Sequence, residues 1–218
     1  MVNLHLILLN SMAVYIPTIY DFIGKVCQFI AIQFFIKPFY AVFYKVRVVG
    51  KENIPKDKTA CVVMPNHLSN NDPPLVSASI DFSIAWMAKD ELFRVPILGW
   101  IITLLAAFSV NREKVEKTTI KAAKEIIKKK WSVGVFLEGT RSKIPGQLGK
   151  PNAGPAYIAI LGHIPILPVG IVGSDKRSGE ITIKIGKPFY PDKDLEKARW
   201  QCAEKLSELT GFKIPKDN

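Results

Sequence analysis

The chain opens with long apolar runs and then changes to shorter segments in which apolar and polar positions alternate. Residues 1–20 contain no Asp, Glu, Lys or Arg, and residues 26–36 form a second apolar run. These runs predict two helices, at about residues 3–20 and 22–36. Pro38 is expected to kink or end the second helix, because proline has no backbone N–H to donate.

Beyond residue 44, short apolar runs are separated by turns and by longer segments with helical periodicity. Asp72 followed by Pro73 marks the start of one helix, with Asp72 as its N-cap. Strands are predicted at residues 46–49, 59–64, 84–88, 107–110, 133–137, 166–172 and 181–185, a helix or turn at 96–105, and helices at 113–130, 153–161 and 193–209. This alternation predicts an α/β fold with a mixed, largely parallel sheet flanked by helices.

Composition divides the chain at about residue 44. Of the first 44 residues, 31 are apolar, and only Asp21, Lys25 and Lys37 are charged. The whole chain has a net charge of +11, nearly all of it after residue 44, and its hydrophobic content of 48% excludes a disordered protein. We therefore predict an N-terminal hydrophobic helical pair at residues 1–44, for membrane association, and an α/β domain at residues 45–218.

The N-terminal segment suits a membrane surface better than a secretory signal. No Lys or Arg precedes the first apolar run and no Ala-x-Ala site follows it, which argues against a signal peptide. The run at residues 26–36 is too short to cross about 30 Å of hydrocarbon. Aromatic residues near Lys37 and Lys45 are typical of the membrane interface. We expect a monotopic helical pair in one leaflet; a buried hairpin of a soluble protein and a single spanning helix at residues 1–20 stay open.

Several other classes of protein are excluded. The three cysteines, Cys27, Cys61 and Cys202, form no CxxC pair, and the chain has only three histidines. These residues provide neither a disulfide framework nor a zinc site. No Walker A or GxGxxG sequence is present, so we expect no metal and no cofactor. Positive charge alone suggests nucleic acid, but RRM-type aromatics and a helix-turn-helix are missing, so no nucleic-acid partner is expected.

The first candidate for chemistry is the segment Asn66–Asp72. In a loop that folds back at a helix start, Asp72 could accept a hydrogen bond from one nitrogen of His67 and fix the imidazole tautomer. The second nitrogen could then take a proton from a substrate hydroxyl. This role is compatible with helix capping, because a carboxylate can accept hydrogen bonds from both an imidazole and a backbone N–H.

The second candidate is the segment from Phe136 to Ser142, which leaves the end of a predicted strand, where ligands of α/β sheets bind. Gly139 allows a tight turn or a close backbone approach. Arg141 offers a planar fork that suits a phosphate, and Arg112 follows another strand in the same way. Lys89 follows a third strand and is either a phosphate contact or a helix-start residue.

Together these residues resemble the glycerolipid acyltransferase family, whose bacterial representative is 1-acyl-sn-glycerol-3-phosphate acyltransferase. The family signature NHxxxxD corresponds to Asn66, His67 and Asp72, a strand ending in Arg to residues 108–112, FxEGTRS to residues 136–142, and a hydrophobic strand with an internal Pro to residues 166–169. The AKxEL segment at residues 88–92, and Lys150 with Gly154, extend the resemblance. Ala107 stands where the family usually has Gly.

The resemblance implies an O-acyltransferase of phospholipid biosynthesis. His67 and Asp72 would act on the sn-2 hydroxyl of lysophosphatidate, and an acyl group would come from acyl-CoA or acyl-carrier protein, giving phosphatidate. Lys89, Arg112 and Arg141 would bind the acceptor phosphate. The acceptor and oxyanion region would include Asn66, Glu138, Gly139, Thr140 and Ser142.

The sequence leaves two alternative functions open. A sibling enzyme would use glycerol-3-phosphate or another lysophospholipid as acceptor, and a lipid-binding module would retain the fold without catalysis. The lipid acceptor and the basic α/β domain both favour a protein bound to a negatively charged membrane surface, which we expect to be the cytoplasmic face.

Overall fold

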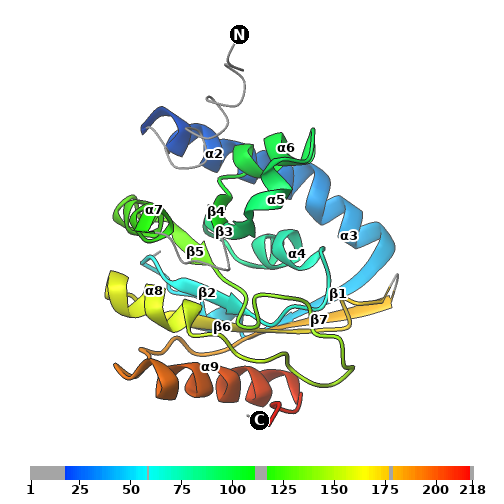
Figure 1. Cartoon of the computed structure of the whole chain (residues 1–218). Helices are drawn as coiled ribbons and strands as arrows, with labels where there is room; N and C mark the ends of the chain where they lie inside the picture. Colours follow the sequence, from blue (N-terminus) through cyan, green and yellow to red (C-terminus); the bar gives the residue numbers. More distant parts are fainter. Residues whose placement is uncertain (1–17, 58, 111–116, 177–178, 217–218) are drawn as a thin grey trace.

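The structure, a computed structural model, describes residues 18–57, 59–110, 117–176 and 179–216. A seven-stranded sheet lies in the middle, with helices on both of its faces (Figure 1). The strands are β1 (Tyr44–Val49), β2 (Val62–Pro65), β3 (Ile84–Lys89), β4 (Phe108–Val110), β5 (Ser132–Gly134), β6 (Ile166–Val172) and β7 (Gly179–Ile185). The predicted α/β fold is confirmed.

The sheet brings the ends of five strands to one edge. Its order is β1-β7-β6-β2-β5-β3-β4, and β6, β2, β5, β3 and β4 are mutually parallel. Strand β7 runs antiparallel to β6, and β1 is parallel to β7. The sheet is therefore mixed and largely parallel, and the carboxyl ends of its five parallel strands share an edge, where α/β proteins bind ligands.

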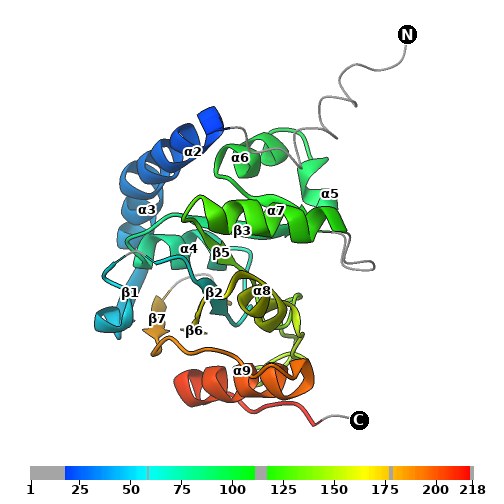
Figure 2. The same cartoon turned by 90° about the vertical axis from the view of Figure 1, so that its left-hand side faces the viewer.

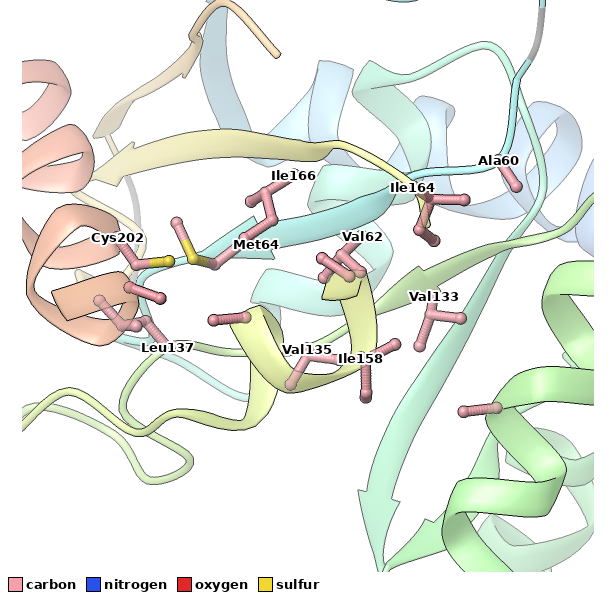
Figure 3. Close-up of a cluster of buried hydrophobic side chains, with 14 of the residues drawn as sticks. Ala60, Val62, Met64, Val133, Val135, Leu137, Ile158, Ile164, Ile166 and Cys202 are labelled. Atoms are coloured by element: carbon pink, nitrogen blue, oxygen red, sulfur yellow. The ribbon is translucent and has the colours of Figure 1, made fainter. Parts of the chain in front are cut away.

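Helices cover the two faces of the sheet. One face carries α7 (Lys117–Lys128), α8 (Gly154–Gly162) and α9 (Leu195–Thr210). In Figure 3, Val62, Met64 and Ile166 of the strands lie close to Ile158 of α8 and Cys202 of α9 in this core. The other face carries α4 (Asp72–Ser79) and an N-terminal helix. The β3–β4 connection contains α5 (Asp90–Phe93) and α6 (Leu98–Leu104), and a 3-10 turn, η2 (Lys51–Asn53), follows β1.

The N-terminal helix continues past Pro38. Of the two outcomes expected at this proline, a kink or an end, the helix therefore does not end there. It comprises α2 (Thr18–Ile30), the π-helical segment η1 (Ala31–Ile36) and α3 (Lys37–Phe43). In η1 the backbone N–H of Lys37 donates to the carbonyl of Ile32, a five-residue spacing. Such a π turn is one of the adjustments that lets a helix continue through a proline, which lacks its own N–H. The first predicted helix, at residues 3–20, lies almost wholly outside the described residues.

The N-terminal helix lies along the domain. The side-chain amide of Gln28 donates to the carbonyls of Ile84 and Leu105, at 2.6 and 2.7 Å. Near the other end, the Tyr40 hydroxyl donates to the carbonyl of Asn71 at 3.0 Å. Both views show this helix on the opposite side of the molecule from α9 (Figure 2). One side of the helix is thus attached to the domain, while much of the rest is exposed.

Candidate active site

The carboxyl edge of the sheet gathers most of the side chains singled out from the sequence. His67 follows β2, Lys89 ends β3, and residues 138–142 follow β5 and its extended continuation. That continuation is fixed by the backbone N–H of Leu137, which donates to the carbonyl of Pro65 at 3.1 Å. The loops after β2 and β5 therefore lie side by side, because these strands pair in parallel.

His67 and Asp72 form the predicted pair. Nδ1 of His67 lies 2.9 Å from Oδ2 of Asp72. In this arrangement Nδ1–H donates to the carboxylate, and Nε2 is left as a proton acceptor. The Asp72 side chain is fully buried, while that of His67 is 14% exposed. A small molecule can therefore reach the imidazole but not the carboxylate.

Asp72 holds the loop before α4 and does not act as an N-cap. It is the first residue of α4, and Asn71 is the N-cap, with no side-chain hydrogen bond to the helix. Oδ2 of Asp72 accepts hydrogen bonds from the backbone N–H groups of Leu68 and Ser69, at 2.7 and 2.8 Å. The predicted helix start is correct, but the N-cap assignment is wrong by one position, because the carboxylate turns back toward His67.

Ser174 also contacts Asp72, and no local sequence pattern indicates this contact. Its hydroxyl donates to Oδ1 of Asp72 at 2.5 Å, and the residue is 2% exposed. Ser174 lies just after β6, and 102 positions separate it from Asp72. The two carboxylate oxygens are therefore fixed from two different strands of the sheet.

An aromatic stack fixes the face of the His67 imidazole. The ring of Phe136 stacks on it, with a centroid distance of 3.9 Å and an angle of 20° between the rings. Trp86 stacks on the other side of Phe136 at 5.2 Å. Because Asp72 fixes an edge of the imidazole and Phe136 a face, few orientations of His67 remain.

Glu138 is buried beside the loop of His67. Its Oε2 accepts a hydrogen bond from the backbone N–H of His67 at 3.0 Å, and its Oε1 is buried without a partner among the described residues. Burial, with a smaller contribution from the charge of Asp72, raises the pKa of Glu138 to about 8. At neutral pH this carboxyl is therefore mostly protonated. It holds the backbone of His67 through one hydrogen bond, and its burial keeps it away from a substrate.

Asn66 is a second support. It is fully buried, and its side-chain amide exchanges two hydrogen bonds with the backbone of Ile171, at 2.9 and 2.7 Å. These bonds continue the pairing of β2 with β6 beyond Pro65. The amide of Asn66 is thus engaged within the fold.

The loop after Glu138 turns sharply and faces solvent. Gly139 has φ of +65°, a value that favours glycine, and a Cβ here would lie 3.0 Å from the amide nitrogen of Asn152. Thr140 and Arg141 are exposed. Ser142 fixes the loop, because its backbone N–H donates to the carbonyl of His67 at 2.8 Å and its hydroxyl to that of Gln147 at 2.7 Å.

The predicted phosphate contacts are only partly placed. Lys89 is exposed, and it is both the last residue of β3 and the N-cap of α5. Lys89 and Arg141 therefore both follow carboxyl ends of strands, as His67 does. Arg112 lies outside the described residues. Within the parts of the chain that the structure covers, no cluster of His, Cys, Asp and Glu is arranged to hold a metal ion.

An apolar pocket of about 420 Å³ opens on the α7 and α8 side of the sheet. Val110 at the end of β4 and Ala153 line it together with Met87, Ala123, Gly154 and Tyr157. Ala153 follows Asn152, whose amide donates to the carbonyl of Glu138 at 2.7 Å. The pocket therefore begins beside the loops that hold His67.

Comparisons with known proteins show which family and fold the chain shares. The model of the protein family described as Acyltransferase matches residues 45–172. A chloroplastic 1-acyl-sn-glycerol-3-phosphate acyltransferase of Brassica napus is 32% identical over 76% of this chain and 52% of its own length. The enzyme of that name from Bacillus subtilis is 29% identical over 76% of this chain and 82% of its own.

A solved structure shares the fold. The crystal structure of the 1-acyl-sn-glycerophosphate acyltransferase PlsC from Thermotoga maritima matches with a TM-score of 0.70 and 27% identity, covering 93% of both chains. Several curated relatives are longer, and this chain spans about half the length of those from Brassica napus, Arabidopsis thaliana and Pseudomonas aeruginosa.

Proposed function

Because this chain belongs to the Acyltransferase family, we propose that it transfers an acyl group from a thioester to the sn-2 hydroxyl of lysophosphatidate. The observation that carries the proposal is the His67–Asp72 pair at 2.9 Å, with the imidazole partly exposed and the carboxylate buried. The chain has no need of a nucleophilic side chain, because the acceptor hydroxyl itself attacks the acyl group.

The reaction follows from the geometry of His67. Nε2 takes the proton of the acceptor hydroxyl as its oxygen attacks the thioester carbonyl. A C–O bond forms, the C–S bond breaks, and the imidazolium returns the proton to the leaving thiolate. Asp72 stabilises the imidazolium during this cycle. We propose the backbone N–H groups of Thr140 and Arg141 as donors to the developing oxyanion.

The acceptor phosphate would bind at the carboxyl edge. Lys89 and Arg141 are exposed there, and Arg112, outside the described residues, follows β4 in the sequence. Arginine can hold a phosphate with two parallel hydrogen bonds. Glycerol-3-phosphate or another lysophospholipid would offer the same phosphate group, so acceptor choice distinguishes the proposed enzyme from a sibling.

The apolar pocket would bind the acyl chain, and Gly154 allows a test. A Cβ at Gly154 would meet no atom within 4 Å, so Gly154→Leu fills the pocket without a backbone clash. We expect this variant to lose about fourfold in kcat/KM for each donor methylene that no longer fits. Gly154→Ala adds only a methyl group and should keep the wild-type profile. Equal loss for short and long donors would place the acyl chain elsewhere.

Ser174 is proposed as a positioning residue for Asp72. Ser174→Ala leaves Oδ1 of Asp72 buried without a donor, and we expect kcat to fall about tenfold, consistent with 1–3 kcal/mol for a lost buried hydrogen bond. KM for the acceptor should stay constant, and Ser174→Thr, which keeps the hydroxyl, should recover most of kcat. A change in KM alone, or no recovery by threonine, would argue against this role.

The N-terminal helix supports monotopic attachment to a membrane. Residues 22–43 are long and apolar enough to cross a bilayer, with a mean hydropathy of 1.6 and only 11% of the most apolar 18-residue stretch buried. Gln28 and Tyr40 nevertheless attach this helix lengthwise to the domain. If this helix crossed the bilayer, the attached domain would have to enter the hydrocarbon with it. We therefore infer that the helix lies in one leaflet, and we propose that this is the leaflet of the cytoplasmic face.

The experiment for the function is an acceptor and donor panel. Wild-type protein is given acyl-CoA and acyl-carrier protein donors of several chain lengths with lysophosphatidate, glycerol-3-phosphate or lysophosphatidylethanolamine in detergent micelles. We expect phosphatidate from lysophosphatidate at the highest kcat/KM. Preference for glycerol-3-phosphate would identify a sibling enzyme, and binding of lysophosphatidate without transfer would identify a lipid-binding module.

A further inference from the structure

Exposed apolar side chains are concentrated on two segments. Within the described residues, 16 of the 20 large apolar side chains that are exposed belong to the N-terminal helix or to the segment of α5 and α6. The second group, here named the α5–α6 patch, consists of Leu92, Val95, Ile97, Leu98, Trp100 and Ile101. Ile97 is 75% exposed and Trp100 is 71% exposed, which is unusual for such side chains without a partner.

The α5–α6 patch adjoins the N-terminal helix. The amide of Gln28, in α2, donates to the carbonyl of Leu105, the C-cap of α6. In both views α2 and α6 lie at the same end of the molecule, away from α9 (Figures 1 and 2). The two groups of exposed apolar residues therefore lie together at one end of the molecule.

The patch is built on a fixed structure. The backbone N–H of Gly99 donates to the carbonyl of Val95 at 2.9 Å, and a Cβ at Gly99 would lie only 2.2 Å from the carbonyl oxygen of Phe93. Helices α5 and α6 thus pack so closely that only glycine fits between them. The exposed apolar side chains of the patch are therefore carried by closely packed backbone.

Few charged residues lie on the two segments. Residues 22–43 and 92–110 contain no Asp or Glu, and their only charged residues are Lys25, Lys37 and Arg94. Asp90 and Glu91 precede the patch on α5, and Arg94 forms an ion pair with Asp90 at 2.6 Å. Continuous apolar and aromatic side chains with few charges among them, together with Lys25 and Lys37, match a leaflet with anionic headgroups.

We propose that the α5–α6 patch is a second membrane contact, which inserts Ile97 and Trp100 into the leaflet occupied by the N-terminal helix. This inference rests on the membrane attachment proposed above and extends it to a segment in the α/β domain. The patch begins three residues after Lys89, at the carboxyl edge of the sheet. Two contacts fix the orientation of the domain, and they bring Lys89 to the depth of the lipid phosphates.

Trp100 is the reporter for the first test. Vesicles of phosphatidylglycerol and phosphatidylethanolamine are prepared with brominated acyl chains, which quench tryptophan within the hydrocarbon. Wild-type protein should lose the Trp100 emission, and Trp100→Phe should lose much less. Trp86 and Trp131 are buried in the fold, and Trp200 is half-buried on α9, so these three residues contribute a background common to both proteins. Equal quenching of both proteins would overturn the proposal.

Variants test whether the contact is needed. Ile97→Glu and Trp100→Glu should each weaken binding to the same vesicles by about tenfold or more. Tyr190→Glu, at a position 69% exposed and outside both segments, is the matched control and should bind as wild type. Unchanged binding of the two patch variants would contradict the inference. The melting temperature of each variant confirms that it is folded.

Activity separates this inference from the proposed function. Both patch variants should lose transfer to lysophosphatidate embedded in vesicles, in step with binding, and keep transfer to a short-chain lysophosphatidate dissolved as monomers. No transfer by wild type to either acceptor would refute the function, whereas the quenching result needs no turnover. Acyl transfer by wild type together with unquenched Trp100 would refute only the second membrane contact. If the protein were then a dimer in solution, a second copy of the chain would be identified as the partner that covers the α5–α6 patch.

Discussion

Replacing His67 with alanine is expected to lower kcat for acyl transfer by about 10²–10⁴-fold, the contribution typical of a general base. In the proposed mechanism, Nε2 of His67 removes the proton from the acceptor hydroxyl, and Asp72 and Phe136 hold the imidazole in place. Binding of the acceptor should change little, because the proposed phosphate contacts are other side chains. The measurement is steady-state transfer to lysophosphatidate in detergent micelles.

A second histidine offers a matched control. His163 is exposed at the C-cap of α8, with φ of +51°. Asparagine tolerates this left-handed conformation, so His163→Asn should fold and keep wild-type activity. A His67→Ala enzyme with a normal melting temperature and near wild-type kcat would show that His67 is not the base.

Replacing Asp72 with asparagine is expected to lower kcat by an amount on the order of 10²–10⁴-fold. The amide oxygen can still face Nδ1 of His67 and the backbone N–H of Leu68, and the NH2 group can donate to the Ser174 hydroxyl. The loop therefore keeps its hydrogen bonds, and only the negative charge that stabilises the imidazolium is lost. The measurement is kcat with saturating acceptor, together with the melting temperature.

Asp194→Asn is the control for replacing a carboxylate that accepts backbone hydrogen bonds with a neutral amide. Asp194 is the N-cap of α9 and accepts hydrogen bonds from two backbone N–H groups, as Asp72 does, but on the far side of the domain. Asparagine is an equally good N-cap, so this variant should match wild type. If Asp72→Asn kept most of its kcat, the carboxylate would serve only to hold the loop.

Local sequence patterns predicted well those helices and strands whose formation depends on residues within a short stretch of the chain. The strand predicted at residues 166–172 has those bounds, and the helix predicted at 193–209 is α9, Leu195–Thr210. Apolar alternation and periodicity are properties of a short window, so such elements can be read from the chain. A kink or an end was predicted at Pro38, and the helix does not end there. The π turn that precedes Pro38 was not predicted, because apolar periodicity does not distinguish a π turn from an α-helical one.

The candidate site likewise combines contacts between residues close in the sequence, which could be predicted, and contacts between distant residues, which could not. The pairing of His67 with Asp72 could be predicted, because five positions separate them within one loop. The support from Ser174 to Asp72 and from Ile171 to Asn66 could not, because 102 and 105 positions lie between the partners. Such contacts depend on the strand order, in which β6 lies beside β2. The α5–α6 patch was also missed, because an apolar run indicates burial until its exposure is known.

The most direct test of the central claim is transfer of a radiolabelled acyl group from acyl-CoA or acyl-carrier protein to lysophosphatidate, with wild type and His67→Ala side by side. Wild type should give labelled phosphatidate and free thiol in equal amounts, and His67→Ala should give at least 10²-fold less of both. Equal rates from the two proteins, or no phosphatidate from wild type with either donor, would contradict it.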